Sequence, residues 1–304
     1  MPAFLKLIRF GNLLFIVLTQ YLIRYFLFIP AGAGISLSDF SYFLLVFATI
    51  CIAAAGYVIN DVYDVEADKI NKPEKRVIGK KISEKTANNL FIILNVTGVS
   101  MGFYLANLIG HPGFSAIFIF TSALLYLYAS YLKQIIVVGN ILISLLVALV
   151  ILLPGLFDLL PAITAENRGI QSLLFSLLLD YAFFAFLINL LREMVKDQED
   201  IRGDYNTGIR SLPIVLGVER TSKAIFALAL IPLMAIIYYL YMYLFENTVA
   251  VLYTLLFILG PLLYFLVQIT SAEKKKDFSR LSFILKIILF FGLISIGLHQ
   301  LLLP

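Results

Sequence analysis

Two groups of three aspartates carry the residues of this chain most suited to chemistry, and they share one spacing, three residues and then four. They are Asp61, Asp64 and Asp68, and Asp197, Asp200 and Asp204. On a helix this spacing places three carboxylates on one face, where like charges repel one another. A bound cation removes the repulsion, and Mg²⁺ prefers oxygen ligands and commonly shares its coordination shell with substrate phosphates. The two groups therefore predict two acidic faces that together hold a diphosphate through metal ions.

Basic and amide side chains accompany both aspartate groups. Asn60 precedes the first group, and Lys75 and Arg76 follow it. Lys196 precedes the second group, and Lys133 stands alone between them. Such cations contact phosphate oxygens directly, although Lys133 is explained equally well as a positive anchor at a membrane surface. The pattern predicts a site in which carboxylates hold metal and neighbouring bases hold phosphate.

The composition places these residues in a membrane. The chain has 304 residues, 61% of them hydrophobic, and its mean hydropathy is +0.97. These values are typical of a protein that crosses the bilayer many times. Because Cys51 is the single cysteine, an intrachain disulfide and a cysteine-ligated cluster are excluded. His111 and His299 are far apart in the sequence, which disfavours a histidine-ligated metal site. The basic residues lie in short loops beside apolar segments, which gives no support for binding nucleic acid.

Nine apolar segments are long enough to span a bilayer, each about 20 residues in length. We expect them at 11–30, 39–60, 86–109, 114–132, 135–157, 172–194, 222–244, 248–270 and 282–302. The first follows basic residues but lacks a small-residue cleavage site, so we expect a span and not a signal peptide. With the N-terminus inside, all but Arg24 and Arg168 of the 23 Lys and Arg residues fall on the cytoplasmic side. Both aspartate groups fall on that side too, and we expect one membrane domain over 1–304.

The reaction that this arrangement favours is ionisation of an allylic diphosphate. Metal and basic residues would neutralise the leaving group. An apolar cavity among the helices would hold an isoprenoid tail, aromatic rings could stabilise the carbocation, and an acceptor would capture it.

The motifs resemble those of the UbiA superfamily of intramembrane prenyltransferases. The matching residues are Asn60-Asp61-x-x-Asp64-x-x-x-Asp68, Asp200-x-x-x-Asp204, the RFGN segment ending at Asn12, and the segment from Tyr128 to Lys133. The resemblance implies an all-α membrane protein with nine transmembrane helices around a central, lipid-open cavity under a cytoplasmic cap. It also implies a place in the cytoplasmic membrane, with the N-terminus and the active site on the cytoplasmic side.

Within the superfamily, the segment 192–217 is most similar to the branch of digeranylgeranylglyceryl phosphate synthases, which move a geranylgeranyl group onto the free hydroxyl of a prenylglycerol phosphate. The resemblance implies that Mg²⁺ binds Asp61, Asp64, Asp68, Asp197, Asp200 and Asp204, of which we expect Asp64, Asp68, Asp200 and Asp204 to be catalytic. The expected substrate-binding residues are Asn60, Lys75, Arg76, Tyr128, Lys133, Lys196 and Asn12. The sequence NKPEKR replaces a more arginine-rich form of its loop, which leaves open whether Lys75 or Arg76 binds diphosphate. Asn12 also suits a polar contact between helices.

Other functions remain open from the sequence. Relatives with the same metal motifs prenylate aromatic quinone precursors, so the acceptor is a lipid or an aromatic compound. A transporter or ion-binding protein would also carry membrane-embedded acids, but here the acids lie at one surface among phosphate-binding bases. A CDP-alcohol phosphotransferase is disfavoured because its Asp-Gly-x-x-Ala-Arg motif is absent. Tail length and oligomeric state are not determined.

Two further charges lie at membrane depth, Arg24 in the first span and Asp180 in the sixth. Buried charges are costly and are usually paired or functional. Because both lie toward the outer surface, we expect them to pair with each other and to serve the fold.

Overall fold

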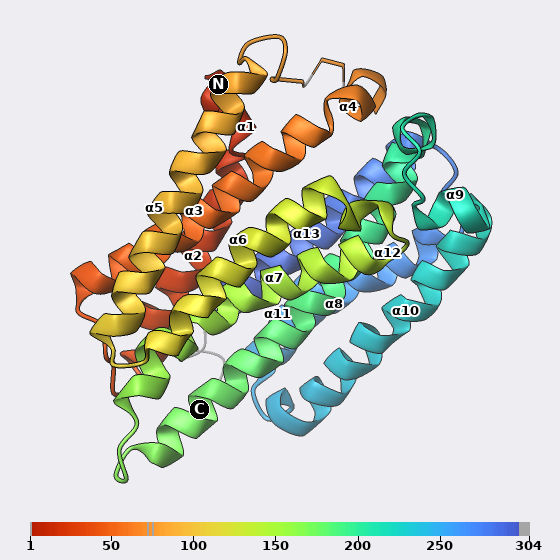
Figure 1. Ribbon diagram of the computed structural model, residues 1–304. Coiled ribbons are helices and arrows are strands. Elements are labelled where there is room, and N and C mark those ends of the chain that lie inside the picture. Colours follow the sequence, from red (N-terminus) through yellow and green to blue (C-terminus); the bar gives the residue numbers. More distant parts are fainter. Residues whose placement is uncertain (1, 72, 75, 298–304) are drawn as a thin grey trace.

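The computed structural model of the chain describes residues 2–71, 73–74 and 76–297, and it is a bundle of helices (Figure 1). The α-helices are α1 (Ala3–Leu7), α2 (Phe10–Leu22), α3 (Asp39–Tyr63), α4 (Val65–Asn71), α5 (Glu84–Leu108), α6 (Ser115–Ser130), α7 (Val138–Pro154), α8 (Arg168–Asn206), α9 (Leu212–Leu216), α10 (Val218–Tyr239), α11 (Thr248–Thr254), α12 (Gly260–Ile269) and α13 (Lys275–Gly297). Short π-helical segments extend several of them, namely η1 (Ile23–Phe28), η4 (Gly155–Leu159), η6 (Leu240–Leu244) and η7 (Leu255–Leu259). Single 3₁₀ turns complete the set, η2 (Pro112–Phe114), η3 (Leu132–Gln134) and η5 (Leu160–Ala162).

Within the described residues, nine helical segments are long and apolar enough to cross a membrane. They are Phe10–Phe28, Asp39–Tyr63, Glu84–Leu108, Pro112–Ser130, Val138–Ala162, Arg168–Asn206, Val218–Leu244, Thr248–Ile269 and Lys275–Gly297. The predicted number and order of spans are confirmed. The ends differ most at the sixth span, which ends at Asn206 and not at position 194, and the last span begins at Lys275 and not at position 282. The predicted end of that span, at 302, lies outside the described residues.

Local sequence signals set several helix boundaries. The Ser38 side chain accepts a hydrogen bond from the Ser41 amide at 3.2 Å, and Ser83 accepts one from the Thr86 amide at 3.1 Å. Both serines cap the first turn of a long helix and satisfy amides that lack an intrahelical partner. Pro154, which cannot donate a backbone hydrogen bond, ends α7, and the helix continues as the wider π-turn η4.

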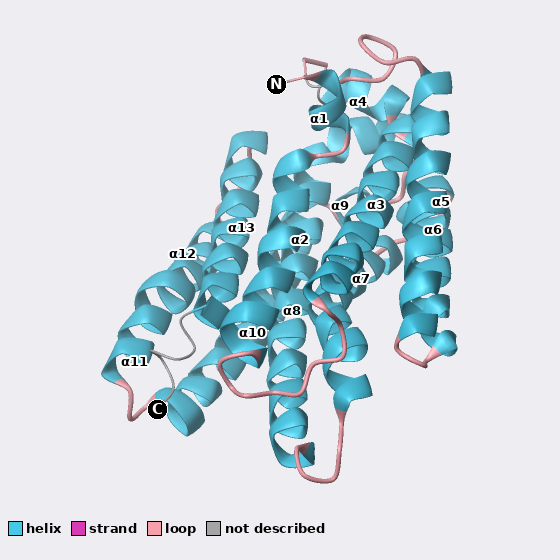
Figure 2. Ribbon diagram, turned by 90° about the vertical axis from the view of Figure 1, so that its left-hand side faces the viewer, coloured by secondary structure: helices cyan, strands magenta, loops and turns pink. Residues whose placement is uncertain are grey.

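Buried apolar side chains of the described residues form four cores, and three of them lie beside the central cavity or join the halves: one in each half of the chain and a third where the halves meet. Leu45, Leu105 and Phe157 belong to the first core, and Leu191, Phe265 and Leu285 to the second. The third core joins α2, α8 and α13 through Leu22, Leu178 and Ile296. In Figure 2, α12 and α13 lie on one side and α5 and α6 on the other, with α2 and α8 between them.

The first aspartate group does not lie on one continuous helix as predicted. α3 ends at Tyr63, Asp64 has φ −90° and ψ 5°, and α4 starts at Val65. The Asp68 amide still bonds to the Asp64 carbonyl at 2.8 Å, so the chain bends at Asp64 without losing the helical path entirely. In the second group, by contrast, Asp197 to Asp204 all lie within the single helix α8.

The predicted pairing of Arg24 with Asp180 is wrong. Arg24 is 1% exposed and donates to Asp158 at 2.7 Å, to Asp39 at 3.1 Å and to the Leu37 carbonyl at 2.8 Å. Asp158 also accepts from the backbone amides of Ser36, at 3.0 Å, and Leu37, at 2.8 Å. The loop between η1 and α3 therefore folds back over the span ends, where its amides bond to Asp158 of η4 and its end brings Asp39 to Arg24. Asp180 lies instead on the wall of the central cavity.

Candidate active site

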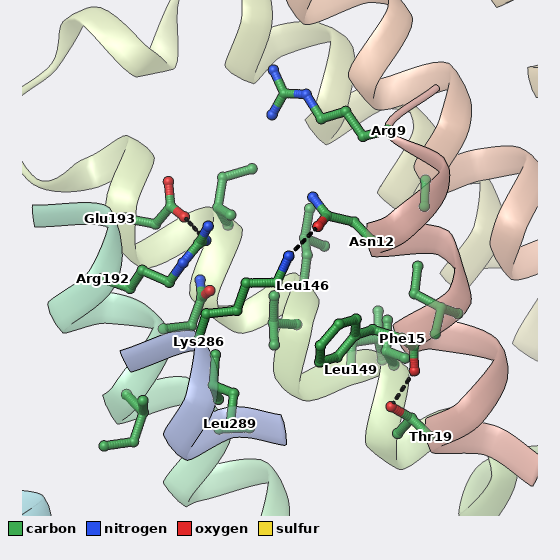
Figure 3. A pocket seen from close by; sticks show the side chains of 18 of the residues that line it. Arg9, Asn12, Phe15, Thr19, Leu146, Leu149, Arg192, Glu193, Lys286 and Leu289 are labelled. Carbon is green, nitrogen blue, oxygen red and sulfur yellow. Dashed lines mark hydrogen bonds and ion pairs between the residues drawn. The ribbon is translucent and has the colours of Figure 1, made fainter. Parts of the chain in front are cut away.

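A cavity of about 1070 Å³ runs between the two halves of the bundle. All six predicted carboxylates line it, from Asp61, Asp64 and Asp68 on the α3–α4 segment and from Asp197, Asp200 and Asp204 on α8. The two groups thus come from opposite halves of the chain to one shared space. Deeper in the cavity the walls are largely apolar, with Phe15 and Leu289 among the lining side chains (Figure 3).

In the first group, two aspartates form ion pairs with cations from other helices. Arg9 donates to Asp61 at 2.9 Å and lies 4.9 Å from the centre of the Tyr57 ring. Partial desolvation in the cavity lowers the pKa of the Arg9 guanidinium, but the Asp61 charge outweighs it, so that this pKa lies above its ordinary value. Lys133 forms an ion pair with Asp64, and only 11% of its side chain is exposed. The sequence-distant Lys133 therefore reaches the acidic face, which a surface anchor would not do.

In the second group, amides from other helices hold the acidic helix. Asn140 on α7 donates to Asp197 at 2.9 Å. Asn71, at the end of α4, donates to the Asp200 carbonyl at 2.9 Å and accepts from the Gly203 amide at 2.9 Å. A Cβ atom on Gly203 would come within 2.2 Å of Asn71, so only glycine permits this approach. Asn71 thereby ties the segment with the first aspartate group to the helix with the second.

The donor atoms suit a hard cation that also binds phosphate. Carboxylate and amide oxygens line the site, and these are the ligands that Mg²⁺ prefers. The buried Oδ1 of Asn60 has no hydrogen-bond partner among the described residues, while its Nδ2 donates to Asp64 at 2.6 Å. No three carboxylate, imidazole or thiol groups of the described chain gather into a complete metal site. Mg²⁺ does not require such a group, because the ion usually takes one or two carboxylates and completes its shell with phosphate and water.

The structure brings most of the predicted substrate-binding residues to this cavity. The residues that line it are Asn12, Asn60, Tyr128, Lys133 and Lys196. Arg76 is not among the described residues on the cavity wall, which departs from the expectation that it contacts the diphosphate directly. Lys75 lies outside the described residues.

Several further polar residues of the same wall are not among the site residues expected from the sequence. They are Arg9, Asn140, Asn189, Arg192, Glu193 and Lys286. Lys286 had the clearest signal, because a lysine inside an apolar span is rarely without a function. Its significance was hidden because the last span was predicted to start at 282, which put Lys286 near a surface, whereas α13 starts at Lys275.

In the described part of the chain, nine candidate spans enclose a largely apolar chamber beneath carboxylates and cations, which is the arrangement of an integral membrane enzyme. The chain belongs to the UbiA prenyltransferase family, whose profile matches residues 21–291. This finding confirms the predicted family and the predicted class of enzyme.

Individual relatives agree with this assignment over the whole chain. The chain is 33% identical over 300 residues to a digeranylgeranylglyceryl phosphate synthase of Methanococcoides burtonii. The alignment covers 97% of this chain and 98% of the relative. A structure of a digeranylgeranylglyceryl phosphate synthase superposes with a TM-score of 0.63 at 23% identity and covers 97% of this chain and 98% of that one. A UbiA homolog from Archaeoglobus fulgidus, bound to DMAPP and Mg²⁺, superposes with a TM-score of 0.58 at 17% identity, covering 97% and 99%. The predicted fold is confirmed.

Proposed function

We propose that this protein transfers a geranylgeranyl group from its diphosphate to the free hydroxyl of a prenylglycerol phosphate, with Mg²⁺ as cofactor. The observation that carries the proposal is the convergence of six aspartates from both halves on one cavity with a largely apolar interior. The full-length similarity to digeranylgeranylglyceryl phosphate synthases supports this choice of donor and acceptor. The Mg²⁺ and prenyl diphosphate bound to the related homolog support the cofactor and the donor class.

The site residues have distinct tasks in this proposal. Asp61, Asp64, Asp68, Asp197, Asp200 and Asp204, with the Asn60 amide oxygen, would hold Mg²⁺, which neutralises the charge that develops on the leaving diphosphate. Lys133 and Lys196 would bind phosphate oxygens as point charges. The apolar walls would order the isoprenoid tail and keep water from the reacting carbon.

The transfer exchanges one carbon–oxygen bond for another. The bond between the allylic carbon and the diphosphate breaks, and both electrons leave with the diphosphate. The acceptor hydroxyl oxygen then bonds to the allylic cation, and its proton is released. No oxidant or reductant is needed, so two lipid substrates and a metal suffice.

The test uses purified protein with geranylgeranyl diphosphate and a panel of acceptors, read by mass spectrometry. We expect an ether product with prenylglycerol phosphate, only when Mg²⁺ is present. Asp64→Asn and Asp200→Asn should each lower turnover by about 100-fold or more, because a group that stabilises transition-state charge is lost. Glu219→Gln is the control, since Glu219 pairs with Lys223 on an exposed face. Product from an aromatic acceptor alone, or turnover that survives either Asp change, would refute the proposal.

A further inference from the structure

Lys286 is a cation inside the cavity, and it pairs with no carboxylate among the described residues. It is the twelfth residue of α13, so it lies about 16 Å along the helix from Lys275. Its Nζ donates to Oδ1 of Asn12 at 3.2 Å and lies 5.1 Å from the centre of the Phe15 ring. Among the described residues it forms no ion pair, and the contacts are those of a neutral amide and an aromatic ring. An ammonium group at membrane depth is costly, and this placement indicates an anionic ligand.

A second group of charges from α8 faces the same space. Arg192 donates to Glu193 at 3.2 Å, and Lys196 donates to Glu193 at 2.9 Å. Figure 3 shows Arg192, Lys286 and Asn12 around one part of the cavity, with Arg9 above them. Arg192 Nε is buried and has no hydrogen-bond partner among the described residues. Glu193 pairs with Arg192 and Lys196, whereas Lys286 pairs with no carboxylate among the described residues, so the part of the wall around Lys286 and Arg192 is positively charged.

We propose that Lys286, Arg192 and Asn12 form the binding site for the phosphate monoester of the acceptor, separate from the metal-bound diphosphate. This inference rests on the proposed function. A phosphate monoester carries about −1.5 to −2 charge at neutral pH, so it is attracted to this positive part of the wall. It also offers several acceptor oxygens to the lysine, the guanidinium and the Asn12 amide.

The position of this site agrees with the geometry of transfer. Arg192 precedes Asp197 by five residues on α8, which corresponds to about 7.5 Å along the helix axis. Glycerol has three carbons, so the free hydroxyl lies at most two carbons from the phosphate ester. A phosphate held by Lys286 and Arg192 therefore places the hydroxyl between that phosphate and the diphosphate at the aspartates. The prenyl tail of the acceptor would follow the apolar wall beyond Phe15 and Leu289.

The test is the binding of a prenylglycerol phosphate to purified protein in EDTA, measured by calorimetry in detergent. The wild-type protein should bind without metal, since no aspartate takes part, and should bind the phosphate-free prenylglycerol much more weakly. Lys286→Gln should weaken binding of the phosphorylated lipid by roughly 10- to 100-fold, the effect of one lost hydrogen bond to a charged group. The KM for this acceptor should rise by the same factor, while the KM for the diphosphate stays unchanged.

Two further variants make the test specific. Lys276→Gln removes an exposed lysine from the same helix outside the cavity and should bind as wild type. Asn12→Asp keeps the side-chain size and places a carboxylate beside Lys286, so it should weaken binding as Lys286→Gln does. Equal affinity of wild type and Lys286→Gln, or binding that requires Mg²⁺, would overturn the phosphate site. Metal-free binding that depends on Lys286, in a protein that makes no ether product, would overturn the proposed function and leave the phosphate site intact.

Discussion

A lysine at the end of a membrane span can anchor the helix at the membrane surface or bind substrate, and for Lys133 the structure bears on this choice. Its ammonium group forms an ion pair with Asp64 in the cavity wall, and its side chain is 11% exposed. A cation placed in this way neutralises the carboxylate when no metal is bound. Under the proposed function, it would turn to a phosphate oxygen when a metal takes its place on Asp64.

We expect Lys133→Gln to raise the KM for the prenyl diphosphate by roughly 10- to 100-fold, because one hydrogen bond between charged groups is lost. The Mg²⁺ concentration at half-maximal rate should not rise, since under the proposed function the lysine would compete with the metal for Asp64. Steady-state kinetics at varied diphosphate and varied Mg²⁺ measure both quantities. Lys69→Gln is a matched control, because Lys69 is exposed and pairs with Glu66 on the outside of the same acidic segment. An unchanged KM for the diphosphate would exclude a contact between Lys133 and the diphosphate.

At the scale of helices, the cluster around Arg24 fixes the ends of three elements. Arg24 on η1 bonds to Asp158 on η4 and to Asp39 at the start of α3. Arg24 and Asp158 are 1% and 0% exposed, whereas Asp39 is 79% exposed. Removal of Arg24 therefore leaves the buried carboxylate of Asp158 without its ion-pair partner. The carboxylate of Asp39 is exposed and loses much less.

We expect Arg24→Leu to destabilise the protein by about 3–5 kcal/mol, the usual cost of breaking a buried ion pair from one side. The double variant Arg24→Leu/Asp158→Leu should recover much of this loss, since no unpaired charge is left. Thermal unfolding in detergent, compared among the variants, measures the effect. Arg168→Leu removes an exposed charge at the start of α8 and should change stability by no more than about 0.5 kcal/mol. The exchange Arg24→Asp/Asp180→Arg should show no recovery, and recovery there would contradict the observed pairing.

At the scale of the whole molecule, the span count and the meeting of the two aspartate groups were predictable from the sequence. Apolar runs of about 20 residues between charged loops define spans directly. Asp61 follows the second span and Asp197 the sixth, and two even-numbered spans end on the same side of a membrane. The carboxylates therefore had to lie at one surface, and a shared cavity needed only that the halves pack side by side.

Features that depend on packing between distant segments were not predictable in the same way. The partners of Arg24 are Asp39 and Asp158, 15 and 134 residues away in sequence, and they meet because a loop folds back over the bundle. The bend at Asp64 follows from contacts of α4 with α8, where Asn71 bonds to the Asp200 carbonyl. Hydropathy alone puts Lys286 near a surface, because it starts the last span after the charged segment. In the structure that charged segment is already helical and forms the start of α13.

The orientation of the whole molecule is a prediction from charge alone. With the N-terminus inside, the loop between α4 and α5 is cytoplasmic, and the segment between η5 and α8 is external. Lysine and arginine next to spans are retained on the cytoplasmic side, and the first of these loops is rich in lysine while the second contains none before Arg168. The aspartates at the ends of α3 and α8 then face the cytoplasm, where a water-soluble diphosphate head group and Mg²⁺ would reach them.

Cysteine labelling in whole cells tests this orientation. Cys51 is buried, and Cys51→Ala provides a background in which single cysteines can be introduced at exposed positions. Lys81→Cys and Ala165→Cys place a thiol in the first loop and in the second segment, where both residues are exposed. We expect a membrane-impermeant maleimide to label the Ala165→Cys variant in intact cells and the Lys81→Cys variant only after permeabilisation. The opposite result would put the aspartates at the outer surface, and both the charge-based orientation and a cytoplasmic site for prenyl transfer would have to be abandoned.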